Sequence, residues 1–185
     1  MEVAISDIKT EFTVEDYYNL PEGRRAELVN GQFYDMAEPN TAHQRMSMFL
    51  SYSIYNHIKK NKGDCEVFSA PFGVRLFADD KTVVEPDISV ICDKNKIDDK
   101  GCNGAPDWVI EILSPSNYIY DTKTKLRLYM RAGVREYWTI DMEDREVTVY
   151  QKNGDTYSIR KYDLEEEITS GIYNDLSIRA ADGLL

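Results

Sequence analysis

Two short apolar runs in the middle of the chain are each interrupted by one carboxylate. Residues 83–91 are rich in Val and Ile and contain Asp87, and residues 108–113 are built in the same way around Glu111. Apolar runs of this length predict buried strands. Burying an unpaired charge costs several kcal/mol, so we expect each carboxylate to be neutralised by a partner. If the two strands are neighbours, both side chains can face the same way and share one cation.

Helical periodicity is strongest between residues 41 and 60. Its apolar positions recur three and four residues apart and predict one buried stripe, made of Met46, Phe49, Leu50, Ser53, Ile54 and Ile58. A short helix from Thr13, ended by Pro21, is predicted from its capping pattern. A third helix is predicted from about Asp121 to Ala132, with Gly133 as its C-terminal signal. Its core-facing residues would be Leu126, Tyr129 and Met130.

The rest of the chain predicts strands and turns. A hairpin is predicted over residues 24–36, around Asn30-Gly31, and an irregular strand over residues 65–77. A polar loop at 93–105 separates the two acid-bearing strands, and Ser114-Pro115-Ser116-Asn117 ends the second. Further strands are predicted at 136–141, 145–151, 157–162 and near 177. This order predicts an α/β (α+β) fold, in which helices flank a mixed central sheet with extra β-hairpins.

Composition narrows the class of protein. The chain has 185 residues, 42% of them apolar, and 13 tyrosines, which favours a single domain over residues 1–185 with a substantial core. We expect neither a signal peptide nor a membrane-spanning segment. The cysteines, Cys65, Cys92 and Cys102, fit neither a disulfide framework nor a zinc motif. We therefore expect reduced thiols and a cytoplasmic location.

The net charge of −11 argues against a protein that coats nucleic acid, because non-specific affinity comes mainly from neutralised phosphates. The charge is unevenly spread, however. Between Asp121 and Arg135 there is one acid against five basic residues, a local balance of +4. A divalent cation would also cancel charge at a site of carboxylates.

The chemistry of a shared cation follows from its ligands. Asp87 and Glu111 offer only oxygen, which selects a hard ion such as Mg²⁺ or Mn²⁺. A lysine beside such an ion can stabilise a pentavalent phosphate or hold an attacking water. Lys125 lies 14 residues after Glu111, at the start of the next helix. Periodicity does not separate it from Lys123, and a simple helix pair with Asp121 would also explain Lys125.

The segments around Asp87 and Glu111 resemble the motif of a known superfamily. Pro86-Asp87 followed by Glu111-Ile112-Leu113 resembles the PD-(D/E)XK signature of restriction-endonuclease-like proteins, with leucine at the usual lysine position. The pattern is similar to that of the Uma-two family of endonucleases, in which the lysine has moved onto the following helix. The matching segments cover most of residues 13–151. They are Glu27-Leu-Val-Asn-Gly31, Pro39-Asn-Thr-Ala-His43-Gln44, Glu111-Ile-Leu-Ser-Pro-Ser116, Asp121-x-x-x-Lys125, Tyr129, Gly133 and Glu136-Tyr-Trp138.

The resemblance implies a magnesium-dependent phosphodiesterase that acts on nucleic acid, with DNA favoured over RNA, and a homodimer would place two sites against two strands. It implies that Asp87, Glu111 and the Ile112 carbonyl hold the metal, that Lys125 is the migrated lysine, and that Glu27 is an accessory acid. Candidate additions are His43 and Lys123 near the reaction, and Arg127 and Arg131 on the nucleic-acid backbone. The alternative function is a catalytically silent member of the fold that serves as a binding or assembly module.

Ordinary structural roles stand beside several of these assignments. Glu27 on a hairpin strand could equally be a solvated residue, and a lone histidine such as His43 is more often a packing or hydrogen-bonding residue. Ser114 and Ser116 are explained by turn chemistry, since no histidine-based triad accompanies them.

Overall fold

A six-stranded sheet forms the centre of the computed structural model, which describes residues 11–115 and 118–184. The strand order is β11-β10-β9-β8-β5-β3. The bounds are β3 (Glu66–Ser69), β5 (Ile88–Ile91), β8 (Trp108–Ile112), β9 (Glu136–Asp141), β10 (Glu146–Asn153) and β11 (Thr156–Asp163). Strands β8 and β9 run parallel and the other neighbours are antiparallel. The predicted mixed sheet is therefore confirmed.

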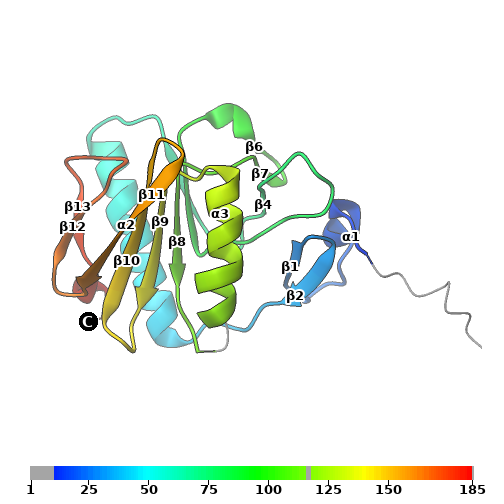
Figure 1. Cartoon of the computed structure of the whole chain (residues 1–185), viewed down its shortest axis with the longest axis horizontal. Coiled ribbons are helices and arrows are strands. Elements are labelled where there is room, and N and C mark those ends of the chain that lie inside the picture. Colours follow the sequence, from blue (N-terminus) through cyan, green and yellow to red (C-terminus); the bar gives the residue numbers. More distant parts are fainter. Residues whose placement is uncertain (1–10, 116–117, 185) are drawn as a thin grey trace, which may run out of the picture.

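Two helices cover opposite faces of this sheet (Figure 1). Helix α2 (Thr41–Lys60) buries Met46, Leu50, Ile54 and Ile58 of the predicted stripe, while Phe49 and Ser53 are half-buried. Because side chains alternate along a strand, Ile110 and Ile112 of β8 pack with the α2 stripe, and Glu111 faces the other helix. Within the described ranges, no helix has both the length and the hydropathy to cross a bilayer.

The helix on the other face begins irregularly. A π-helix, η3 (Tyr120–Lys125), precedes the regular α3 (Leu126–Ala132), and Gly133 ends it with φ +84°. The predicted helix from about Asp121 to Ala132 is therefore confirmed in its extent, although its first half is a π-helix and not an α-helix. A π turn closes i→i+5 hydrogen bonds and so takes up one extra residue, which rotates the α3 residues about the helix axis. Tyr129 is buried as predicted, but its companion is Leu128, and Leu126 and Met130 are only half-buried.

The N-terminal part confirms two predictions from local sequence. Helix α1 (Val14–Tyr18) is capped at its N-terminus by Thr13, which forms a capping box with Asp16. Strands β1 (Ala26–Val29) and β2 (Gln32–Asp35) form an antiparallel hairpin. Its turn residues Asn30 and Gly31 have φ +50° and +77°, as a two-residue turn with two positive φ angles requires.

Two further small sheets lie in the segments outside the central sheet. The segment predicted as a polar loop contains a 3₁₀ turn η2 (Lys94–Lys96) and two short strands, β6 (Ile97–Asp98) and β7 (Gly101–Asn103). Strand β7 lies between β6 and β4 (Val74–Arg75) and pairs with both. Near the C-terminus, β12 (Glu167–Thr169) pairs with β13 (Ser177–Arg179), and η4 (Ala180–Leu184) comes after them. Strands of two or three residues are too short to show a period, so the sequence missed β6, β7 and β12. Residues 116 and 117 of the predicted turn lie outside the described residues.

A disulfide joins Cys65 and Cys92, so the expectation of reduced cysteines is wrong for this pair. Glu66 pairs with Ile91 in the antiparallel ladder of β3 and β5, which places the next two residues, Cys65 and Cys92, opposite each other. Their Cα atoms are 3.8 Å apart. Sequence spacing does not reveal this register. Cys102 is free and buried.

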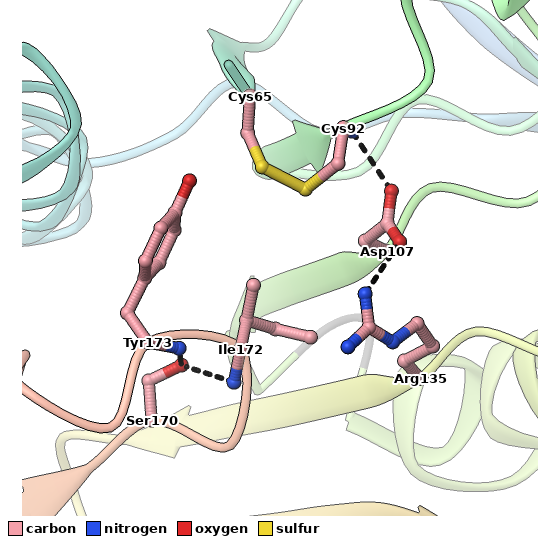
Figure 2. The surroundings of a disulfide bond; sticks show 7 residues. All are labelled: Cys65, Cys92, Asp107, Arg135, Ser170, Ile172 and Tyr173. Atoms are coloured by element: carbon pink, nitrogen blue, oxygen red, sulfur yellow. Dashed lines mark hydrogen bonds and ion pairs between the residues drawn. A yellow bond between two sulfur atoms is a disulfide. The ribbon is translucent and has the colours of Figure 1, made fainter. Parts of the chain in front are cut away.

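A hydrogen bond and an ion pair connect the disulfide to the residues directly before β8 and β9 (Figure 2). Asp107 accepts a hydrogen bond from the Cys92 backbone N–H at 2.8 Å and pairs with Arg135 at 3.0 Å. Disulfides persist mainly in oxidising compartments. The cysteine argument for a cytoplasmic location therefore no longer holds.

Candidate active site

The two acids of the apolar runs lie side by side at one edge of the sheet. Ile88 of β5 pairs with Ile110 of β8, and one step beyond this pair stand Asp87 and Glu111. The Asp87 backbone N–H donates to Glu111 Oε2 at 3.3 Å, and the Ile112 N–H donates to Asp87 Oδ2 at 2.7 Å. Asp87 itself occupies a bend directly before β5, not the middle of a strand as expected. Its side chain is 16% exposed, so it can be reached from solvent.

Lys125 is the centre of the cluster. Its Nζ lies 2.8 Å from Glu111 Oε1, 2.9 Å from Glu27 Oε1 and 3.6 Å from Asp121 Oδ1. The Tyr129 hydroxyl donates to the same Glu111 oxygen at 2.6 Å. All five side chains are buried. The ammonium group therefore holds acids from a hairpin, a sheet strand and its own helix.

Negative charge exceeds positive charge in this cluster. Glu27, Asp87, Glu111 and Asp121 face one buried ammonium, that of Lys125. Burial, together with the neighbouring carboxylates, raises the pKa of Glu111 well above its ordinary value against the pull of Lys125. Burial likewise raises the pKa of Asp121 to about 6. Burial alone would lower the pKa of Lys125, but Glu111 and Glu27 outweigh it and hold that pKa well above its ordinary value.

His43 joins the cluster from the other face of the sheet. It lies in the first turn of α2, where Asn40 caps the helix by accepting from the His43 backbone N–H at 2.9 Å. Its Nε2 is 3.1 Å from Asp87 Oδ2, while its buried Nδ1 has no hydrogen-bond partner among the described residues. Burial lowers the pKa of His43, but the hydrogen bond and charge of Asp87 outweigh this and raise it overall.

A second ion pair supports Glu27. Arg25 pairs with Glu85 at 2.9 Å, and the Glu85 backbone N–H donates to Glu27 Oε1 at 2.7 Å. This bond fixes the carboxylate that faces Lys125. The Arg25 side chain remains 40% exposed, which leaves a positive group at the rim of the cluster.

The cluster opens into a cleft of about 560 Å³. The cleft is lined by Arg25, His43, Gln44, Asp87, Glu111, Ile112, Ser114, Asp121 and Lys125, among others. A neighbouring cavity of about 390 Å³ reaches Asp121 and Lys125 from the side of Glu27, Tyr34 and Tyr120. The carboxylates and the lysine can therefore meet a ligand larger than a water molecule.

Other residues singled out in the sequence lie elsewhere. Lys123 is exposed and points away, so the geometry separates it from Lys125. Arg127 and Arg131 are exposed on α3, and the guanidinium of Arg131 lies 4.0 Å from the centre of the Phe77 ring. None of these three side chains lines the cleft or the neighbouring cavity. Ser116 lies outside the described residues.

Two members of the cluster are not predicted as site residues from the sequence. Asp121 is expected there only as a surface helix partner of Lys125, and Tyr129 only as a core residue. The spacing of four residues from Asp121 to Lys125 to Tyr129 is the available signal, because residues four apart share one side of a helix. Hydroxyl and carboxylate groups on that side indicate a polar cluster.

The donor atoms fit a hard divalent cation. Asp87 and Glu111 supply carboxylate oxygens, and the backbone carbonyl of Ile112 supplies an uncharged oxygen, which hard cations also accept as a ligand. Over residues 11–115 and 118–184 there is no group of three or more Asp, Glu, His or Cys side chains with metal-binding geometry. A cation held here would thus keep several water or substrate oxygens, as Mg²⁺ typically does.

The mixed sheet flanked by helices is the fold of a solved structure. A crystal structure described as a putative nuclease belonging to DUF820, from Anabaena variabilis, has the same fold, with a TM-score of 0.74 over 94% of this chain and 97% of that chain at 22% identity. The profile of the Uma2 family, described as "Putative restriction endonuclease", matches residues 14–181. An uncharacterized Synechocystis protein, slr1290, is 31% identical over 144 residues, 76% of this chain and 74% of that protein. The chain belongs to the Uma2 family.

Proposed function

We propose that this protein is a metal-dependent endonuclease that hydrolyses phosphodiester bonds, with DNA favoured over RNA. The observation that carries the proposal is the surplus of buried carboxylates around Lys125 at the wall of an open cleft. An uncompensated buried charge is costly, and a divalent cation together with a phosphate would balance it. The description of the family as restriction endonucleases favours DNA.

The roles follow from the contacts. Asp87, Glu111 and the Ile112 carbonyl would hold Mg²⁺ or Mn²⁺, which supplies Lewis-acid stabilisation of the phosphate and lowers the pKa of water. Lys125 stays protonated between its carboxylates. It therefore serves as a donor, which orients the attacking water and stabilises charge on the phosphate oxygens, and not as a base.

The remaining residues position these groups. Glu27 and Asp121 hold the ammonium of Lys125 from two further sides, and Tyr129 fixes one oxygen of Glu111. His43 holds Asp87 in place. Arg25, half-exposed at the rim of the cleft, is suited to a phosphate oxygen of the substrate.

The test combines metal binding and cleavage. Thermal unfolding of the wild type and of Glu111→Gln is followed as MgCl₂ or MnCl₂ is added, because a ligand at about 100 times its Kd stabilises by about 2.7 kcal/mol. Supercoiled plasmid and a matched RNA are then incubated with both proteins. Lys123→Ala, an exposed change two residues from Lys125, is the control.

The expected result is metal-linked stabilisation and nicking by the wild type and by Lys123→Ala. Glu111→Gln should lose the stabilisation and at least about 100-fold in rate, more than the loss of an outer-shell contact. Equal cleavage by Glu111→Gln would overturn the assignment. Nucleic-acid binding without metal-linked stabilisation or cleavage would favour the silent binding module instead.

A further inference from the structure

Helix α2 presents a row of exposed side chains on the side turned away from the sheet. The row consists of Arg45, Met48, Tyr52, Tyr55 and Lys59, spaced alternately by three and four residues. Met48, Tyr52 and Tyr55 are 71%, 63% and 50% exposed, and the two basic residues are also exposed. We call these five residues the outer row.

The charge of this helix is the reverse of that of the whole chain. Residues 39–63 contain four basic residues and no acid, in a chain with a net charge of −11. The Nζ of Lys59 lies 5.4 Å from the centre of the Tyr55 ring, so cation and aromatic surface adjoin. The acid at the edge of the row, Asp182, is paired with Arg179. The face therefore complements a polyanion.

We propose that the outer row binds single-stranded nucleic acid, with bases stacked on Tyr52 and Tyr55 and phosphates near Arg45 and Lys59. This deepens the proposed function and rests on it for the identity of the ligand. Exposed tyrosines beside basic groups are the usual means of holding single strands without sequence preference. At about 1.5 Å per residue, Arg45 and Lys59 are about 21 Å apart along the axis, the length of about six nucleotides at 3.4 Å each.

The outer row is continuous with the cleft. Gln44 lines the cleft of the acid cluster and also the surface depression that contains Arg45 and Met48. His43, the preceding residue, contacts Asp87. A strand whose phosphate lies at Lys125 can thus leave the cleft past Gln44 and continue along α2.

A second copy of the chain is a poorer occupant of this face. A two-fold contact through the outer row would place Arg45 and Lys59 against the same residues of the partner. The helix has no acid to pair with them, and like charges across an interface cost several kcal/mol. A polyanion meets no such repulsion.

The test measures binding in EDTA, so that it does not depend on cleavage. Anisotropy of a labelled 20-nucleotide single strand and of a 20-base-pair duplex is recorded for the wild type, Tyr52→Ala/Tyr55→Ala and Arg45→Ala/Lys59→Ala. Lys152→Ala/Arg160→Ala removes the same charge from two exposed positions on β10 and β11, outside the outer row, and is the matched control. Sedimentation gives the oligomeric state of each protein.

We expect the double tyrosine variant to bind the single strand at least about tenfold more weakly, with a change of less than about threefold for the duplex, whose base faces are hidden. Arg45→Ala/Lys59→Ala should reduce the slope of log K against log salt by about 1.4, and the control should not. Unchanged binding by the tyrosine variant, or a wild-type dimer that it converts to a monomer without loss of binding, overturns the inference. If the wild type binds through the outer row yet never cleaves, the inference stands and the proposed function fails.

Discussion

Replacing Lys125 by methionine should destabilise the protein strongly, because it leaves Glu27, Glu111 and Asp121 in the interior without their cation. The side chains of all three acids are no more than 7% exposed. At an effective dielectric constant of about 20, a pair at 2.8 Å has a gross attraction of about 6 kcal/mol. Loss of the desolvation cost of the ammonium offsets part of this. The expected net loss is about 3–5 kcal/mol, as for other broken buried pairs.

The loss should depend on pH in a definite direction. The pKa values of Glu111 and Asp121 are already raised in the folded wild type, and removing Lys125 raises them further. An acid with a raised folded pKa binds more protons folded than unfolded, so stability falls as pH rises from about 4 through the folded pKa. Lys125→Met should therefore be most destabilised at pH 8 and less so at pH 5.

Urea unfolding followed by the fluorescence of the two buried tryptophans, Trp108 and Trp138, measures this effect. With a slope of about 2 kcal/mol/M, the loss corresponds to a midpoint lower by about 2 M. Lys123→Met is the matched control and should change stability by no more than about 0.5 kcal/mol. Equal midpoints for the two variants at pH 8, or a larger loss at pH 5 than at pH 8, would refute the reasoning.

Three further predictions concern the same structure. Asp121→Asn should stabilise the protein at pH 8 and have little effect at pH 5, since the wild-type acid titrates near pH 6; urea unfolding at both pH values checks this. Reducing the disulfide of Cys65 and Cys92, which closes a loop over 27 residues, should lower the free energy of unfolding by about 3.5 kcal/mol. Thiol titration in urea should find one free thiol, Cys102, and three would contradict the pairing. His43→Ala should weaken Mg²⁺ binding 10- to 100-fold, through loss of support for Asp87, as titration calorimetry would measure; unchanged affinity would exclude that support.

Sequence patterns within one segment were sufficient to predict the elements that depend only on neighbouring residues. The period of α2, the capping box at Thr13 and the Asn30-Gly31 turn each depend on neighbours along the chain, and each appears as predicted. The π-helix does not follow from such neighbours. It shifts the buried face to Leu128.

For the site, the sequence determined which residue types were present: two acids in apolar runs, and two lysines on the next helix as candidates. Tertiary structure decided which of them meet. The antiparallel register of β5 and β8 places Asp87 beside Glu111, and the helix turns Lys125 inward and Lys123 outward. The same kind of register brings Cys65 to Cys92. Composition and spacing constrain single elements, whereas pairings depend on how strands align, which is decided by packing across the whole core.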